Sequence, residues 1–319
     1  MISFTLGVED LADTRFAVSP SQETVFSVWV LRDPGRYPLH LPWRRSVLRR
    51  ISPADHRLLL ALVGDSRALP DFLTPRPTTF FRTFEEELAG VRETPARIVR
   101  RDLLATHAPG RLPDVLAEID DAERLLELIC DLLQRYWDTI LLPLWSRLKL
   151  VLEADITYRA RQLATGGARA LFADLHPNVR WDDGVLRIEK MIGQHHVGAG
   201  GRGLLLAPSV FAYKPVPPMD PSEAPMLAYP ARGLATLWST EPTTDATALA
   251  ALIGAPRATL LGLLSEGPPT SELARRLKVT PSAVSQHLKV LHASGLVTRT
   301  RDGRQVLYRR SGLGDQLTG

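Results

Sequence analysis

Cysteine is almost absent from this chain. Cys130 is the one cysteine among 319 residues, so the chain can form neither an internal disulfide nor a cysteine-based zinc cluster. It lies in the stretch LLELICDLLQRYW, where apolar residues recur at helical spacing. We therefore predict that Cys130 is a buried, unreactive thiol on a helix.

Long apolar runs and targeting signals are missing as well. The longest strongly apolar stretch without a charge, TILLPLWS, is far shorter than the ~20 residues that cross a bilayer as a helix. The start, MISFTLGVEDLADTRF, carries acidic residues and lacks the basic, apolar and small-residue order of a signal peptide. We therefore expect a cytoplasmic protein, and its length is sufficient for two domains.

No catalytic or metal-binding motif stands out. The sequence has no G-x-S-x-G motif, no recognisable set of nucleophile, base and acid, and no paired carboxylates in a catalytic frame. His195 and His196 lie in GQHHVGAGGRG without further ligands at useful spacing, so we expect a polar loop there. The glycines precede a strand-like run, which favours a flexible hairpin connection over a phosphate cradle. We predict no enzyme activity, no cofactor and no metal.

The last seventy-odd residues carry the clearest pattern. The stretch TSELARRLKVTPSAVSQHLKVL predicts two short amphipathic helices joined by a tight turn. Thr280 is placed to cap the second helix, Pro281 suits its first position, and Gly295 ends it. We expect Val279 of the turn to point into the core. The helical apolar stripes that share this core are Leu273, Ala274, Leu277, Val284, Leu288 and Leu291.

The opposite face of the second predicted helix is polar. Ser282, Ser285, Gln286 and Lys289 would project from it, and Thr280 stands at its start. These side chains can hydrogen-bond to phosphates or base edges if the helix enters the major groove of DNA. Two small amphipathic helices alone fit a purely structural role equally well.

An arginine-rich hairpin follows the helix pair and favours DNA binding. In GLVTRTRDGRQVLYRR, two strand-like runs meet at Asp302-Gly303, a strong turn signal. The arginines on and around it are Arg299, Arg301, Arg304, Arg309 and Arg310. Residues 247–319 contain ten Lys and Arg against four Asp and Glu, a net charge of +6, whereas residues 1–246 carry −2. A basic wing beside a helix-turn-helix is the electrostatic footprint of a DNA-binding domain.

Residues 248–310 resemble the ArsR/SmtB-type winged-helix regulators of bacteria. The stretches SELARRLKVTPSAVSQHLKVLHASGLV and RTRDGRQVLYR carry this resemblance. It implies a transcriptional repressor that binds operator DNA as a homodimer and releases it when an effector binds. The founding members sense metals, in part through a cysteine pair on the first helix of the motif, but TSELARRL contains no cysteine. Because the chain ends soon after the wing, we also expect the family's long C-terminal helix to be missing.

The preceding residues predict an α+β domain over 1–240, with the winged helix-turn-helix over 247–319. Helices are expected in ETVFSVWVLRDP, from near Thr83, and through the long apolar pattern that Pro143 should interrupt. VRWDDGVLRIEKMI predicts a hairpin around Asp183-Gly184, and GRGLLLAPSVFAY and APMLAYPARG predict two further strands. We therefore expect helices first and a small antiparallel sheet after them, with WSTEPTTDAT as the linker. The stretches DLADTRFAVSP, PDFLTP and LLLAPSVFAY also resemble parts of the long N-terminal domains of some ArsR-type regulators from high-GC bacteria.

Some 240 residues beyond a bare winged helix must dimerise, bind an effector, or do both. An organic ligand could be held between the helices and the sheet, the usual setting for a small-molecule site. The aromatic candidates for such a pocket are Trp137, Trp145, Phe172, Trp181 and Phe211. A solid core that only dimerises is the alternative. Two other functions also remain open: an enzyme with a fused DNA-binding tail, and a protein-interaction module that uses the winged helix as its surface.

Overall fold

Two units make up the chain in the computed structural model, Met1–Trp238 and Ser239–Gly319. The structure describes residues 1–191, 193–234, 237–238, 246–264, 270–277, 279–302 and 305–318. Most of the predicted linker, residues 239–245, lies outside the described residues. No helix in the described parts of the chain is long and apolar enough to cross a membrane.

A buried helix, α2 (Pro20–Arg32), lies at the centre of the helical part of the first unit. The other helices and helical turns before residue 137 are α1 (Val8–Ala12), η1 (Pro34–Arg36), η2 (Pro38–His40), α3 (Leu41–Leu48), α4 (Pro53–Ala61), η3 (Asp71–Leu73), α5 (Phe84–Arg92), α6 (Ala96–His107), α7 (Asp114–Ala117) and α8 (Ala122–Tyr136). Ser19 caps α2 by accepting a hydrogen bond from the Gln22 N–H at 3.1 Å. Because α4, α5 and α8 pack around it, all but its last residue is buried.

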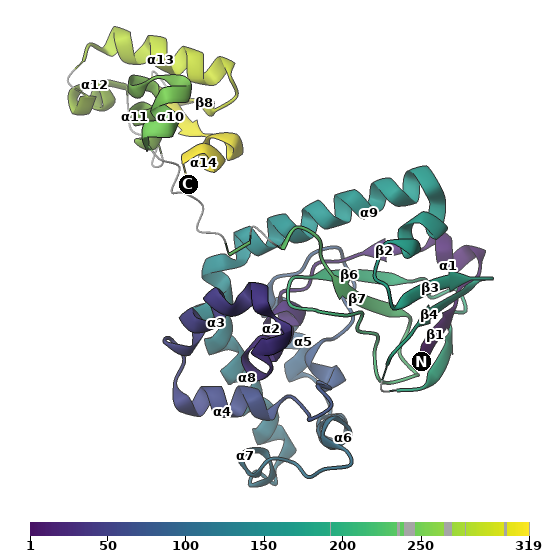
Figure 1. The fold of residues 1–319 in the computed structure, drawn as a ribbon. Helices are drawn as coiled ribbons and strands as arrows, with labels where there is room; N and C mark the ends of the chain where they lie inside the picture. The colour runs from purple at the N-terminus through teal and green to yellow at the C-terminus, as the bar shows by residue number, and fades with distance from the viewer. Residues whose placement is uncertain are drawn as a thin grey trace. The chain divides into compact units, whose positions relative to one another are not determined.

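The long helical pattern is interrupted at Pro143, as expected from the missing N–H of proline. After α8 the chain makes a π-helical turn, η4 (Trp137–Leu141), and a 3-10 turn, η5 (Leu142–Leu144). The long helix α9 (Trp145–Ala173) then begins. In Figure 1 the helices α2–α8 lie at one end of this unit and the strands at the other, and α9 runs along both.

The described strands of the first unit form two sheets. They are β1 (Ile2–Thr5), β2 (Arg15–Phe16), β3 (Val179–Asp182), β4 (Val185–Ile188), β5 (His195–Gly198), β6 (Leu205–Ser209) and β7 (Met226–Pro230). The strand orders are β3-β4-β1-β5 and β2-β6-β7. The predicted hairpin joins β3 to β4, and both turn residues, Asp183 and Gly184, have positive φ.

The α+β class is confirmed, but the expectation of one antiparallel sheet is wrong. β1, β3 and β4 pair antiparallel, whereas β1–β5, β2–β6 and β6–β7 are parallel pairs. Leu205 and Ala207 of β6 face the core shared with the helices, and Leu206 faces a second core shared with β1 and β4. The three-stranded sheet is thus covered on both faces. Parallel sheets are typically buried in this way, which explains why β6 and β7 are continuous apolar runs.

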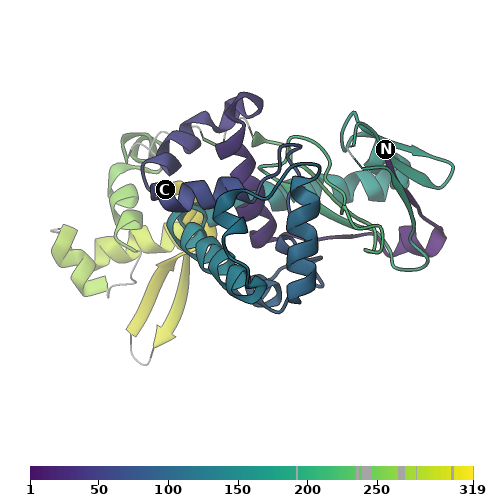
Figure 2. The ribbon, with the colours of Figure 1, turned by 90° about the horizontal axis from the view of Figure 1, so that it is seen from below.

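The second unit is a winged helix-turn-helix. Its elements are α10 (Ala246–Ile253), α11 (Ala255–Gly262), α12 (Thr270–Leu277), α13 (Pro281–Ala293), β8 (Val297–Asp302), β9 (Gln305–Arg310) and α14 (Gly312–Thr318). α11 and α12 pack on α13, and β8 pairs antiparallel with β9 to form the hairpin seen as two yellow strands in Figure 2. The apolar side chains of these elements form a core of their own.

The sequence did not predict α14. The hydroxyl of Ser311 accepts a hydrogen bond from the Gly314 N–H at 3.1 Å, and Leu317 packs against the core of the unit. These contacts offset the low helix propensity of the two glycines in this segment. The helix has seven residues and contacts α10, α11 and β9.

Candidate nucleic-acid interface

The local sequence of α13 sets its boundaries and its buried face as predicted. Thr280 precedes the helix in an extended conformation, and its hydroxyl accepts a hydrogen bond from the Ala283 N–H at 3.3 Å. Gly295 follows the helix with a φ of +74°, the left-handed conformation that commonly ends helices. The apolar stripe is buried in the core of the unit: Val284, Leu288 and Leu291.

The polar face of α13 is exposed. Ser282, Gln286 and Lys289 follow one another at helical spacing, and all three are exposed. Ser285 is half-buried, and its hydroxyl donates a hydrogen bond to the Pro281 carbonyl at 2.9 Å. This face therefore exposes the amide of Gln286 and the ammonium group of Lys289 to solvent, whereas the Ser285 hydroxyl is bonded to the helix backbone.

The turn between α12 and α13 differs from the prediction at Val279. The side chain is 45% exposed instead of pointing into the core. Its N–H donates a hydrogen bond to the Ala274 carbonyl at 3.0 Å, which closes the end of α12. Leu273 and Ala274 of α12 and Val284 of α13 already fill the space between the helices, so the turn is fixed by its backbone. Lys278 lies outside the described residues.

The register of the wing distributes its arginines over both faces of the ribbon. Arg299 lies opposite Tyr308, and Arg309 lies opposite Thr298. Because neighbouring residues on a strand alternate between faces, the exposed side chains of Arg299 and Arg309 lie on opposite faces. Arg301 lies on β8 opposite Val306. Arg304 and Gly303 of the predicted turn lie outside the described residues.

Arg310 has a different environment from the other wing arginines. Its Nε atom lies 2.9 Å from a carboxylate oxygen of Asp315 on α14, and its side chain is 20% exposed. The sequence grouped Arg310 with the arginines that would meet DNA. The structure instead assigns it to the contact between the wing and α14.

The five aromatic residues predicted to line one pocket are not brought together. Trp137 stacks on Phe84 with ring centroids 4.6 Å apart, and Trp145 packs edge-on against it at 5.3 Å. Phe172 and Trp181 lie in the second core, 5.1 Å apart. These rings fill two separate apolar cores instead of lining one cavity, because close ring packing removes apolar surface from water.

Phe211 belongs to a third aromatic group in the same unit. Its ring centroid lies 4.9 Å from that of Trp43 and 5.3 Å from that of His40, and Trp238 packs against all three rings. Burial lowers the pKa of His40 to about 4, so its ring is neutral at physiological pH. None of the five predicted aromatic residues lines either of the two hollows near α6.

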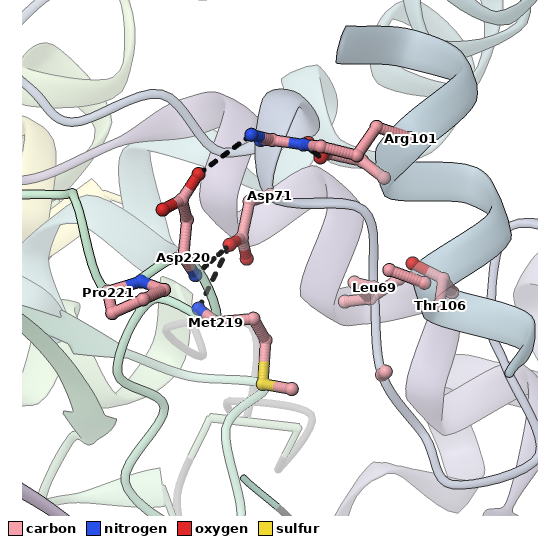
Figure 3. A pocket seen from close by; sticks show the side chains of 10 residues that line it. Leu69, Asp71, Arg101, Thr106, Met219, Asp220 and Pro221 are labelled. Atoms are coloured by element: carbon pink, nitrogen blue, oxygen red, sulfur yellow. Dashed lines mark hydrogen bonds and ion pairs between the residues drawn. The ribbon is translucent and has the colours of Figure 1, made fainter. Parts of the chain in front are cut away.

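Two hollows of the first unit share a cluster of charged side chains. The sequence did not predict this cluster. The volumes of the hollows are about 280 and 450 Å³, and Asp71, Arg101, Asp102 and Asp220 line both. Figure 3 shows Arg101 extending from α6 towards Asp220, with Asp71 beneath them. These residues come from η3, α6 and the segment before β7, so no local sequence motif could have indicated them.

The charged cluster is tightly bonded. Arg101 pairs with Asp102 through Nε at 2.8 Å and with Asp220 through Nη1 at 3.0 Å. The Oδ2 atom of Asp71 accepts hydrogen bonds from the N–H groups of Met219 and Asp220, both at 2.9 Å. Burial raises the pKa of Asp71 to about 6, and the nearby Asp102 carboxylate adds to this shift, although the two N–H groups oppose it.

The glycine-rich stretch after His196 connects the two sheets rather than two strands of a hairpin. The carboxylate of Asp10 on α1 accepts hydrogen bonds from the N–H groups of Gly201 and Gly203 in this loop, at 2.8 and 3.2 Å, and from Gly7 at 2.9 Å. Burial would raise the pKa of Asp10, but these N–H groups hold it below its usual value. The backbone amides that could cradle a phosphate are therefore occupied by a carboxylate of the chain itself.

The two consecutive histidines lie in β5 and not in a polar loop. β5 pairs parallel with β1, and the Nδ1 and Nε2 atoms of His196 lie 2.9 Å from the Ser3 hydroxyl and 3.2 Å from the Thr5 hydroxyl. Among the described residues, no group of three or more His, Cys, Asp or Glu side chains could hold a metal ion. Cys130 is a free, fully buried cysteine, and burial raises the pKa of its thiol to about 11, as expected for an unreactive side chain.

Comparison with known proteins finds similarity in the second unit. The family model described as "Bacterial regulatory protein, arsR family" matches residues 256–299. Over 38 residues the chain is 58% identical to the HTH-type transcriptional repressor SmtB of Mycobacterium tuberculosis, in strains CDC 1551 / Oshkosh and H37Rv. The match covers 12% of this chain and 28% of each relative, so the chain spans less than a third of the curated relatives that it matches. No solved structure matches the chain.

Proposed function

We propose that this protein, whose residues 256–299 form an ArsR-type helix-turn-helix domain of a transcriptional regulator, is a repressor that binds operator DNA as a homodimer. The observation that carries the proposal is the exposed polar face of α13, which presents Gln286 and Lys289 beside an arginine-bearing wing. An amide can pair with an adenine edge in the major groove, and cationic side chains neutralise phosphates. Repression itself is taken from the curated relatives, whose name describes a repressor.

The surface of α10 supports association into a dimer. Leu252 is 73% exposed there, although neighbouring Leu249 is buried in the core of the unit. We propose that Leu252 pairs with its counterpart in a second copy, where its apolar side chain would be removed from water. A two-fold dimer also places two recognition helices about 34 Å apart, one turn of the DNA helix.

The first unit has the role of sensing in this proposal. A small organic effector bound there would change the affinity of the protein for DNA, and the protein would act in the cytoplasm, where its operator lies. We propose regulation rather than catalysis, because Arg101, Asp102 and Asp220 of the charged cluster are engaged in ion pairs with one another.

Selection from a random duplex library tests the function. The full-length protein should enrich a two-fold symmetric sequence whose half-sites are separated by about one helical turn. Footprinting of the enriched duplex should protect both half-sites. Libraries that stay random after repeated selection, while a control DNA-binding protein enriches its own site, would contradict the proposal.

A further inference from the structure

The larger of the two hollows has the size and position of a ligand site. Its volume is about 450 Å³, within the range of roughly 300–1,000 Å³ typical of small-molecule pockets. Residues of α2 and α6, the chain from Gly90 to Pro95, and the segments 71–76 and 216–228 line it. We call this space the acidic hollow. It lies entirely within the first unit.

Gln22 gives the acidic hollow an unsatisfied amide. The side chain lines the hollow and is only 1% exposed. Neither its Oε1 nor its Nε2 atom has a hydrogen-bond partner among the residues that the structure describes. A buried amide without partners costs free energy, so proteins seldom keep one unless something else satisfies it. Phe26, one turn further along α2, lines the same hollow and supplies an apolar wall.

The charge of the lining favours a cation. Five carboxylates line the acidic hollow, from Asp71, Glu93, Asp102, Asp220 and Glu223, against the two guanidinium groups of Arg76 and Arg101. Arg101 already pairs with Asp102 and Asp220. A cleft lined by an excess of one charge concentrates ligands of the opposite charge.

Asp71 is the carboxylate best placed to meet such a ligand. It lines both hollows, and its carboxylate accepts hydrogen bonds from two backbone N–H groups. Among the residues that the structure describes, no cationic side chain pairs with it. Arg76 is the one guanidinium of the lining that could attract an anion instead. Its guanidinium remains charged at neutral pH, but its Nη2 atom donates a hydrogen bond to the Arg202 carbonyl at 3.3 Å, and the Glu223 carboxylate of the same lining attracts it.

We propose that the acidic hollow binds a small organic amine with an aromatic or apolar skeleton. The ammonium group lies at Asp71, the skeleton contacts Phe26 and Ile98, and a polar group at the far end meets the amide of Gln22. The role of this amine as an effector rests on the proposed function, whereas the binding of the amine to the first unit is independent of that function.

Matched probes that share one skeleton test the charge of the ligand. Calorimetric titration and thermal shift of the full-length protein use 2-phenylethylamine, 2-phenylethanol and 3-phenylpropionate, together with tyramine, which adds a hydroxyl on the ring. The amines should bind and raise the melting temperature. Tyramine should bind more tightly than 2-phenylethylamine, because its hydroxyl can pair with Gln22. Equal or tighter binding of 3-phenylpropionate, or no binding of either amine at millimolar concentration, overturns the proposal.

Two variants test the residues. Asp71→Asn keeps an acceptor for the two backbone N–H groups and should weaken amine binding about tenfold or more, since it removes a charge-assisted hydrogen bond. Gln22→Met should raise the melting temperature of the free protein and abolish the preference for tyramine. Asp131→Asn is the control. Asp131 lies on α8 in an exposed ion pair with Arg92 of α5, so this variant should bind the amines like the wild type. Amine binding unchanged in both Asp71→Asn and Gln22→Met overturns the proposal.

DNA binding measured on the same preparations separates the two proposals. If the amines fail to bind while the selected duplex binds normally, the amine-site proposal is wrong and DNA binding by a regulator is still supported. If the amines bind and Asp71→Asn abolishes this binding, but no duplex is ever selected, the amine site is supported and the regulatory function is contradicted.

Discussion

Gln286 and Lys289 share the exposed face of α13 but would contact different parts of DNA. The carboxamide of Gln286 can donate to and accept from an adenine edge at once, whereas the Lys289 ammonium is a flexible point charge suited to phosphate. We predict that Gln286→Ala costs about 1–3 kcal/mol on the selected duplex and relaxes the preference at one base position. Binding to matched and single-base-changed duplexes measures this.

Lys289→Ala is the matched control for Gln286→Ala. It should weaken all duplexes alike and reduce the salt dependence of binding by about one unit of slope. A selected-sequence profile that Gln286→Ala leaves unchanged would show that another face of α13 reads the bases.

Glu23 gives the first unit an unusual pH dependence. Its side chain is fully buried, and Oε2 accepts a hydrogen bond from the Val210 N–H at 2.9 Å. Burial raises its pKa from 4.5 to about 8, although hydrogen bonds from Ser209 and Val210 oppose the shift. Between these values the native state holds a proton that the unfolded chain has lost. The free energy of unfolding therefore decreases as the pH rises through this window.

Glu23→Gln should remove that dependence, because an amide of the same shape does not titrate. Between pH 4.5 and 8 the wild type should lose a few kcal/mol of stability that the variant keeps, at about 1.4 kcal/mol per unit of pKa shift. Urea denaturation across pH 4.5 to 8 is the measurement, with the exposed Glu118→Gln as control. Stability curves that run parallel for wild type and Glu23→Gln would contradict the neutral, buried carboxyl.

At the scale of elements, the register of the wing predicts different roles for its arginines. Arg299 and Arg309 are exposed on opposite faces of the ribbon, whereas Arg310 pairs with Asp315 of α14. We predict that Arg299→Ala lowers DNA affinity and the steepness of its salt dependence, as expected for a lost phosphate contact. Arg310→Ala should instead lower the melting temperature of the second unit and leave the salt dependence nearly unchanged.

Affinity measured at several salt concentrations distinguishes the wing arginines, and Arg309→Ala shows which face of the ribbon meets the backbone. Equal losses of salt dependence in Arg299→Ala and Arg310→Ala would mean that the ion pair with Asp315 opens when DNA binds.

The elements that the sequence predicts well are those whose causes are local. The buried stripe of α13, the Thr280 cap, the Gly295 stop and the Asp183-Gly184 hairpin each follow from residues within one or two turns. The prediction that Val279 points into the core was wrong, because the direction of its side chain depends on which neighbouring side chains fill the core.

The parallel sheets and the charged cluster could not be predicted in the same way. β1 pairs with β5, which begins at His195, and Asp71 meets Arg101 and Asp220 only after three separate segments have packed together. Such contacts depend on the tertiary fold, which no periodicity in the sequence records. The same is true of the five predicted pocket aromatics, which fill separate apolar groups instead of one cavity.

At the scale of the whole molecule, operator binding through two recognition helices requires a dimer. Sedimentation of the full-length protein at micromolar concentration should show a species of twice the chain mass. Leu252→Asp should weaken the dimer, because it places a charge on the exposed apolar surface of α10. Leu313→Asp, at a leucine 50% exposed on α14, is the control in the same unit. Monomer alone for the wild type, both with and without DNA, would contradict the proposed assembly.

The most direct test of the central claim is the salt dependence of binding to the selected duplex and to a scrambled one. We predict that the wild type prefers the selected duplex by about 10³-fold or more at physiological salt. Its affinity should fall by about 10³-fold or more between 50 and 200 mM salt, as several phosphate contacts release their counterions. Equal affinities for both duplexes, or an affinity that salt does not change, would contradict a DNA-binding regulator.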